Sequence, residues 1–325
     1  GKVALEMDTM ATQVVTLADI DAAAERIKDH VRRTPCLRSR FTLNPLHRGE
    51  LLLKLECLQV TGSFKARGAS NAVLALDAAA RARGIITASG GNHGLAVAYA
   101  SHFTGVPAVV YLPELTLAEK IEKIRAWGAD VVVEGSVWDD ANDAAMARAE
   151  LDGLTYIAPF SDPAVIAGQG TVGREMLQQS PHIDILIVAI GGGGLISGVA
   201  TAAKAIKPEI TVIGVEPVGA PTLKTSVEKG RLVTLPGIDT EAVTLAPRKS
   251  AEINLDIVRR NVDDIILVSD DEMREAARWL WFEAGVAAEL SGAASLAALQ
   301  AGRVGAPAES VVSAVVCGTG IAGLA

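Results

Sequence analysis

Short apolar runs alternate with segments of helical spacing along most of this 325-residue chain. The apolar runs at 84–88, 108–112 and 183–190 have the length of buried strands, and a helical pattern follows each of them. Parallel strands need a long crossover connection, usually a helix, so this order predicts parallel sheets with helices on their faces. The alternation therefore predicts an α/β fold.

The alternation falls into two successive parts. The first covers residues 84–158, and the second begins with a helix over 164–178 and ends with a strand over 311–316. The least regular stretch, 221–254, contains prolines among mixed charges and is predicted to be a long connection over the surface. The chain is therefore expected to form two lobes.

Charge and composition narrow the class of protein. The formal net charge is −8 and no basic run is present, which argues against nucleic acid as a partner. No apolar run is long enough to cross a bilayer, so no membrane association is expected. Residues 1–9 lack the hydrophobic core of a signal peptide and are interpreted as a tail, so a cytoplasmic location is predicted. Cys36, Cys57 and Cys317 are widely spaced, which argues against a disulfide framework or structural zinc.

One lysine stands among small, turn-forming and aromatic residues, in the stretch Thr61–Gly68. This stretch follows a strand-like run at 51–55 and precedes an alanine-rich helical segment over 69–80, whose first turn would hold Lys65. A lysine that is partly desolvated near a helix N-terminus has its neutral, nucleophilic form within reach, as a Schiff-base lysine requires. From this stretch alone, an ordinary exposed lysine in a first helical turn is the alternative.

Four consecutive glycines, Gly191–Gly194, separate a buried strand from a helix. Backbone amides without side chains can wrap a phosphate there, and the helix N-terminus adds partial positive charge. A dinucleotide site is the nearest rival, since Glu216 ends the next strand where a ribose-binding acid belongs. Its register is unfavourable, because the last glycine of the G-x-G-x-x-G pattern would fall on Ile196 or Ser197.

Two further loops follow predicted strands and carry polar groups. Ser89–Gly94 offers a hydroxyl, an amide, an imidazole and bare backbone amides at a helix start, a combination that can hold a carboxylate or a phenolic oxygen. Cys317–Gly320 ends a buried strand and can bring a thiol to a ring nitrogen, although a buried cysteine is more often a small hydrophobic residue. In open parallel sheets, ligands bind outside the carboxyl ends of the strands, so these loops are expected to meet.

The order of these motifs is more specific than any one of them. S-F-K, S-G-G-N-H-G, G-G-G-G-L and C-G-T-G, in this order, resemble the fold type II pyridoxal-5′-phosphate enzymes, in the branch of serine/threonine dehydratases (ammonia-lyases) and serine racemases. Ile166–Thr171 and Gly214–Pro217 share the resemblance. It implies a two-lobed α/β fold like that of the tryptophan synthase β chain, each lobe a mostly parallel sheet flanked by helices. Residues 10–77 with 164–325 would form the large cofactor-binding domain, and 78–163 the small substrate-side domain.

The resemblance also implies roles for individual residues. Lys65 would be the catalytic residue and would form a Schiff base with pyridoxal 5′-phosphate. The other residues implied to bind the cofactor are Asn92 at its 3′-oxygen, Gly191, Gly192, Gly193, Gly194 and Leu195 at its phosphate, Cys317 at its pyridine nitrogen and Glu289 near its ring. The residues implied to bind the substrate carboxylate are Ser89, Gly91, Asn92 and His93.

The implied reaction is β-elimination, that is dehydration and deamination, of a β-hydroxy amino acid such as L-threonine or L-serine to a 2-oxo acid and ammonia. Lys65 would act as the base for the Cα proton. A thiol at Cys317 is a poor partner for a pyridinium, which favours prompt elimination over a long-lived carbanion. Gly90 stands where the racemases of this branch carry a hydroxyl that reprotonates the opposite face, so little racemisation is expected.

Several alternatives stay open on the sequence. Arg248 and Lys249 make an acidic substrate such as 3-hydroxyaspartate conceivable, although a solvated charge pair in a loop is the preferred interpretation. β-Replacement and racemisation are possible within the same fold. A nicotinamide-dependent oxidoreductase and a non-catalytic cofactor carrier are the alternatives from other classes.

A metal site is not expected, although some relatives bind a divalent cation near a Glu-Pro segment. Glu216 and the Ala220 carbonyl are available, but Thr222 occupies the position where an acid would be needed. Glu216 is therefore interpreted as a solvated carboxylate at a strand end. The expected partners are a small amino-acid substrate and, by the resemblance, a second copy of the chain in a homodimer.

Overall fold

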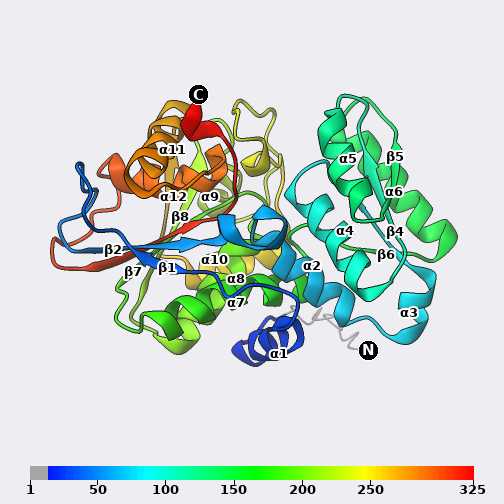
Figure 1. Cartoon of the computed structure of the whole chain (residues 1–325), viewed down its shortest axis with the longest axis horizontal. Coiled ribbons are helices and arrows are strands. Elements are labelled where there is room, and N and C mark those ends of the chain that lie inside the picture. Colours follow the sequence, from blue (N-terminus) through cyan, green and yellow to red (C-terminus); the bar gives the residue numbers. More distant parts are fainter. Residues whose placement is uncertain (1–13) are drawn as a thin grey trace, which may run out of the picture.

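Two sheets form two lobes in the computed structural model, which describes residues 14–325 (Figure 1). The larger sheet has the strand order β1-β2-β10-β7-β8-β9, and the smaller sheet the order β5-β4-β3-β6. β1 runs antiparallel to β2, whereas the other neighbouring strands of the described residues pair in parallel. The predicted α/β fold with two mostly parallel sheets is confirmed. The predicted tail over 1–9 lies outside the described residues.

The large lobe contains both ends of the described chain. Its strands are β1 (Cys36–Arg38), β2 (Glu50–Leu55), β7 (Ile185–Ala189), β8 (Thr211–Pro217), β9 (Asp264–Val268) and β10 (Val311–Val316). Its helices are α1 (Leu17–Ile27), α2 (Lys65–Leu74), α7 (Pro163–Gln179), α8 (Gly194–Ile206), α9 (Thr222–Lys229), α10 (Glu252–Asn261), α11 (Asp270–Ala284) and α12 (Leu290–Gln300). Short 3₁₀ turns cover Glu56–Leu58, Val60–Gly62, Val243–Leu245 and Ala322–Leu324.

The small lobe is a continuous insertion between β2 and β7. Its strands are β3 (Ile85–Ala88), β4 (Ala108–Leu112), β5 (Asp130–Val133) and β6 (Thr155–Tyr156). Its helices are α3 (Ala78–Arg83), α4 (Asn92–Thr104), α5 (Ala118–Ala126) and α6 (Trp138–Asp152). α2 lies between the lobes and packs against α7 on one side and α4 on the other (Figure 1). The domain boundaries at residues 78 and 163 stay a prediction.

Apolar residues fill both sheets because helices cover their faces. All residues of β3, β4 and β7 are buried, which matches the near-continuous apolar sequence of strands buried on two sides. Among residues 14–325, no helix is both long and apolar enough to span a bilayer.

The predicted helix over 69–80 is wrong in its bounds. α2 already begins at Lys65 and ends at Leu74, and α3 begins only at Ala78. The break occurs because the Asp77 side chain accepts a hydrogen bond from the Ala80 amide and so caps a new helix. Lys65 therefore stands at the first residue of a helix.

The prediction of a surface connection over 221–254 is also wrong in part. α9 occupies 222–229, and α10 begins at Glu252. Leu235 and Leu245 are buried between these helices, so part of the stretch belongs to the core of the large lobe. The prolines and charges that indicated a loop are confined to the segment between the helices.

Candidate active site

The turn that carries Lys65 is fixed by pairing with the segment after β10. Ser63 and Gly318 form an antiparallel bridge, and the Phe64 amide donates to the Cys317 carbonyl at 3.2 Å. The Thr319 amide donates to the Gly62 carbonyl at 2.8 Å. The lysine turn and the C-G-T-G segment, 252 residues apart in the sequence (317 minus 65), therefore lie side by side.

The Lys65 amine is half-buried and has an acceptor. Its Nζ donates to the Pro159 carbonyl at 2.7 Å and lies 5.4 Å from the centre of the Phe64 ring. Burial lowers the pKa of Lys65 to about 8, because the charged ammonium form loses hydration. Near physiological pH a minor but usable fraction of the amine is therefore neutral.

The glycine loop follows β7 and opens α8. Gly193 has φ 102°, a left-handed conformation that favours glycine, and it caps the N-terminus of α8. The first amides of α8 have no acceptor inside the helix, so they point partial positive charge out of its N-terminus. A side chain would not fit at Gly192, since a Cβ there would lie 2.0 Å from the Phe160 ring. The loop is thus a bare backbone cradle suited to an anion.

Neutral side chains from outside the loop hold the cradle. Ser250 Oγ donates to the Gly192 carbonyl at 2.6 Å. Fully buried Asn254 packs on Gly193, and its Nδ2 donates to the Phe160 carbonyl at 2.9 Å and to Ser197 Oγ at 3.1 Å. Ser250 and Asn254 come from the end of the stretch that the sequence placed on the surface.

The Ser89–Gly94 loop leads into the first turn of α4, which begins at Asn92. Gly91 precedes that helix without a side-chain cap, so the first amides of α4 are free of helical acceptors. His93 is buried, and its Nε2 bonds the Ile157 carbonyl at 2.9 Å, while Nδ1 has no partner. Burial and, to a smaller extent, the nearby Lys65 amine lower the pKa of His93 to about 3, so the imidazole is neutral.

Asn92, Glu289 and Cys317 meet beside the lysine turn. Asn92 Nδ2 donates to Glu289 Oε1 at 2.8 Å, and a Cβ on Gly318 would lie 2.2 Å from that same oxygen. Cys317 is buried, and its thiol donates to the Ser291 carbonyl at 3.3 Å. Burial raises the pKa of the Cys317 thiol, and it also raises the pKa of Glu289. Burial thus disfavours the charged form of both groups.

Glu216 is not the solvated carboxylate that the sequence suggested. The residue is fully buried at the end of β8, and its Oε1 accepts from the amides of Leu223 and Lys224, both at 3.0 Å. Burial raises the pKa of Glu216 to about 8. The carboxyl group therefore caps α9. Among residues 14–325, no group of three or more His, Cys, Asp or Glu side chains is placed to hold a metal ion.

The structure brings four separate motifs into one region, as the sequence predicted for loops at strand ends. It also reveals contributors that the sequence did not single out. These are Pro159, Phe160, Ser250, Asn254 and the buried charges around Arg67. Pro159 and Phe160 follow β6, so their place after a strand was an available signal. Together the residues offer an amine, an anion cradle and neutral polar groups for a flat ring.

Comparisons with known proteins agree with this arrangement. Residues 27–318 match the protein family described as "Pyridoxal-phosphate dependent enzyme". The chain is 40% identical over 286 residues to the L-threonine ammonia-lyase of Thermotoga maritima, covering 88% of this chain and 71% of that protein. It is 38% identical over 283 residues to the serine racemase of Arabidopsis thaliana, covering 87% of this chain and 85% of that protein.

This chain also resembles solved structures in its fold. Maize serine racemase superimposes with a TM-score of 0.91 at 36% identity, covering 95% of this chain and 94% of that chain. The expected two-lobed fold type II architecture is thereby confirmed. The chain belongs to the pyridoxal-phosphate-dependent enzyme family, and its cofactor is pyridoxal 5′-phosphate.

Proposed function

We propose that this protein is an ammonia-lyase that eliminates the β-hydroxyl group of L-threonine or L-serine and yields a 2-oxo acid and ammonia. The observation that carries the proposal is a half-buried lysine with a lowered pKa in the same region as an open anion cradle. The similarity to L-threonine ammonia-lyases supports the substrate class.

The residues present fit pyridoxal phosphate. The backbone amides of Gly191, Gly192, Gly193, Gly194 and Leu195 would bind its phosphate at the N-terminus of α8. The Phe160 ring leaves no room for a side chain at Gly192, so the backbone stays bare there. Lys65 would attach to its aldehyde carbon, and Asn92 would donate to its ring oxygen. When bound, the cofactor supplies an electron sink for bond breaking at the substrate Cα.

Neutral groups would surround the ring. Because the pKa of Cys317 is raised, the group facing the pyridine nitrogen would be an uncharged thiol. Glu289 has a raised pKa as well and accepts a hydrogen bond from Asn92, which orients the Asn92 amide. A neutral thiol at Cys317 would favour prompt loss of the β-hydroxyl group from the substrate.

Lys65 would remove the Cα proton once its amine is free. A pKa of about 8 leaves a usable fraction of neutral amine at pH 7, and the Pro159 carbonyl orients Nζ through the 2.7 Å hydrogen bond. The substrate carboxylate would bind to Ser89 and to the first amides of α4, at Gly91, Asn92 and His93. The neutral His93 side chain would add no positive charge to this site. Its hydrogen bond to the Ile157 carbonyl would instead hold the first turn of α4 in place.

Racemisation is the second candidate, since serine racemases are among the similar proteins. Gly90 offers no hydroxyl at the position that would have to return a proton from the opposite face. A Cβ at Gly90 would lie 3.1 Å from Thr116, so this part of the loop is closely packed without a side chain. We therefore infer that elimination exceeds racemisation.

The test is product analysis with purified protein and added pyridoxal phosphate. We expect 2-oxobutyrate from L-threonine or pyruvate from L-serine, with equal amounts of ammonia, and slower formation of the D-amino acid. Added thiol should leave the product unchanged, which separates elimination from β-replacement. 3-Hydroxyaspartate belongs in the panel, although Arg248 is exposed and donates to the Leu235 carbonyl at 3.0 Å. A racemisation rate equal to elimination would overturn the proposal.

We also propose a homodimer and a cytoplasmic location. Phe41, Leu43, Phe282 and Ile321 are largely exposed, and large exposed apolar side chains are typical of protein interfaces. Sedimentation equilibrium would test the dimer: a monomer at micromolar concentration contradicts it.

A further inference from the structure

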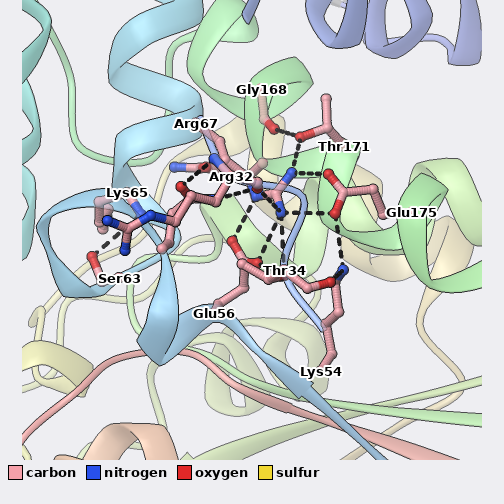
Figure 2. Close-up of polar contacts among 12 residues, drawn as sticks. Arg32, Thr34, Lys54, Glu56, Ser63, Lys65, Arg67, Gly168, Thr171 and Glu175 are labelled. Atoms are coloured by element: carbon pink, nitrogen blue, oxygen red, sulfur yellow. Dashed lines mark hydrogen bonds and ion pairs between the residues drawn. The ribbon is translucent and has the colours of Figure 1, made fainter. Parts of the chain in front are cut away.

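A cluster of buried charges lies behind the lysine turn (Figure 2). We propose that Arg67 in this cluster is a positioning residue for Lys65: it fixes the first turn of α2 and so aims the Lys65 amine. The inference rests on the proposed function of Lys65. Figure 2 shows Lys65 and Arg67 close together at the start of the same helix, and Lys65 Nζ donates to the Pro159 carbonyl, which lies outside the cluster.

Arg67 is fully buried and joins three parts of the large lobe. Its Nε and Nη2 donate to the two oxygens of Glu56 at 2.6 and 2.8 Å, a two-pronged contact of fixed geometry. On α7, Nη1 donates to Thr171 Oγ1 at 3.1 Å, and the guanidinium also pairs with Glu175. A turn held at several points in different directions has little freedom to rotate.

Lys54 on β2 completes the cluster. Its Nζ donates at 2.9 Å to Glu175 Oε1, to Gln179 Oε1 and to the Thr34 carbonyl. Thr171, Glu175 and Gln179 are spaced four residues apart, so α7 presents them on one face. Arg67 and Lys54 balance Glu56 and Glu175, which leaves the buried cluster without net charge.

The backbone of α2 also approaches α7 closely beside Arg67. A Cβ on Gly168 would lie 2.6 Å from the Gly68 Cα, and the Gly68 amide donates to Gln169 Oε1 at 3.1 Å. The Arg67 amide bonds the Phe64 carbonyl at 3.0 Å and closes the turn that contains Lys65. A shift of Arg67 would therefore carry Lys65 with it.

Stability alone is a poor explanation for such a cluster. Taking ions out of water is costly, and well-packed apolar residues often replace a buried ion pair without loss of stability. Apolar residues cannot fix the rotation of the lysine turn, whereas the two-pronged contact between Arg67 and Glu56 can. Apolar packing would hold α2 against α7 but leave the Lys65 amine less well aimed.

The cluster also determines the charge near Lys65. The titratable groups that face the amine are Cys317, in the segment after β10, and His93 on α4; both favour neutral forms. Loss of the Arg67 charge alone would leave one unbalanced buried carboxylate close to the lysine turn. The Lys65 amine would then hold its proton more tightly, so charge and position must be tested separately.

The experiment compares wild type with Arg67→Met, Arg67→Lys and the double variant Arg67→Met/Glu56→Gln, which removes one cation and one carboxylate and so restores neutrality. The first readout needs no cofactor: the pH dependence of Lys65 acetylation by acetic anhydride, followed by peptide mass spectrometry. The second is the rate at which pyridoxal phosphate becomes trapped on Lys65 with borohydride. Lys54→Met is the matched control, because it disturbs the cluster without changing α2. Circular dichroism and unfolding midpoints verify that each variant folds.

We expect Arg67→Met to raise the pH midpoint of Lys65 acetylation, and Arg67→Lys and the double variant to return it toward wild type. The trapping rate should nevertheless stay low in the folded double variant, by about 100-fold, because a misplacement of about 1 Å has that effect on a reacting group. Arg67→Lys should recover the rate only in part. Lys54→Met should lose far less than Arg67→Met, because it leaves the same unbalanced carboxylate but keeps the two-pronged contact of Arg67 with Glu56. A folded double variant with the wild-type trapping rate would overturn the inference, as would Lys54→Met slowed to the same extent.

Failure of the proposed function would look different. If wild type itself traps no cofactor on Lys65, the proposed role of Lys65 is wrong. The acetylation midpoints still decide whether Arg67 controls the Lys65 amine: midpoints equal in wild type and Arg67→Met contradict the inference without reference to the cofactor.

Discussion

Two segments of the site, the glycine loop over 191–194 and the lysine turn over 63–67, are held by different kinds of contact. Around the glycine loop the contacts are steric or neutral: the Phe160 ring, Ser250 Oγ and the Asn254 amide. Behind the lysine turn they are ionic, from Arg67 to Glu56 and Glu175.

The buried carboxyl groups follow the same division. Glu216, near the N-terminus of α9, has a pKa raised to about 8 by burial and is neutral below that pH. For Glu175, burial acts in the same direction, but the neighbouring Arg67 and Lys54 outweigh it and lower the pKa. Burial thus favours the uncharged form of Glu216, whereas Glu175 stays ionised beside its two cationic partners.

The difference has a physical reason. A loop that binds an anion through backbone amides must keep negative charge away, and uncharged supports achieve this. A lysine that works through its neutral form needs desolvation without a nearby net charge. A balanced ionic cluster gives rigidity and leaves the pKa of Lys65 to burial. The following predictions test this contrast, from the largest effect to the smallest.

Lys65→Ala should abolish elimination, with a fall of more than about 1,000-fold, since both the cofactor attachment and the base are lost. Initial rates of 2-oxo acid formation measure the effect. Lys204→Ala is the control, because Lys204 pairs with Asp263 and has no assigned role. Comparable losses in both variants would remove Lys65 from the reaction.

Glu175→Gln should lower the free energy of unfolding by about 3–5 kcal/mol, because two buried cations then share one remaining carboxylate. Glu216→Gln at pH 6 should cost less than about 1 kcal/mol, since it replaces a neutral group and keeps the oxygen that accepts from Leu223 and Lys224. Denaturant titration of the cofactor-free protein measures both. Equal losses would show that the two regions do not differ in charge.

Gly192→Ala should weaken pyridoxal phosphate binding by about 10- to 100-fold, because the new methyl group meets the Phe160 ring and overpacking costs about 1–3 kcal/mol. Adding Phe160→Ala should recover part of the affinity by making room. Gly237→Ala is the control, since nothing lies within 4 Å of a Cβ there. Spectrophotometric titration gives the affinities, and full affinity in Gly192→Ala would disprove a closely packed cradle.

The last prediction concerns a gradual change with pH, not a loss at a single pH. The pKa of Glu216 is raised from 4.5 to about 8, so the stabilising protonated form is fully present below pH 4.5 and is lost as the pH rises through 8. Glu216→Gln should therefore remove a decline in stability across this window, with a slope of at most about 1.4 kcal/mol per pH unit. Unfolding free energies of variant and wild type at several pH values test this. Parallel curves would mean that Glu216 is ionised in the fold.

The sequence predicted most of the architecture because strand and helix periodicity is local. The four motifs lie at strand ends or helix starts, so their meeting also followed from the rule for parallel sheets. The residues that hold the glycine loop from outside were not predicted. Ser250 and Asn254 lie at the end of the stretch that the sequence predicted to be a surface connection, and their contacts with the glycine loop are set by tertiary packing.

The buried charged cluster behind the lysine turn was also not predicted from the sequence. Arg67, Lys54, Glu56 and Glu175 are ordinary charged residues in sequence, and only a fold that brings β2, α2 and α7 together reveals that they neutralise one another. Glu216 was misjudged for the same reason: burial depends on α9, which the sequence did not indicate.

The most direct measurement is the site of cofactor attachment. Purified protein loaded with pyridoxal phosphate is reduced with borohydride, digested and mapped by mass spectrometry. The account predicts a pyridoxyl group on Lys65, with none on buried Lys54 or on surface lysines such as Lys204. Attachment at another lysine, or none at all after loading with the cofactor, would contradict it.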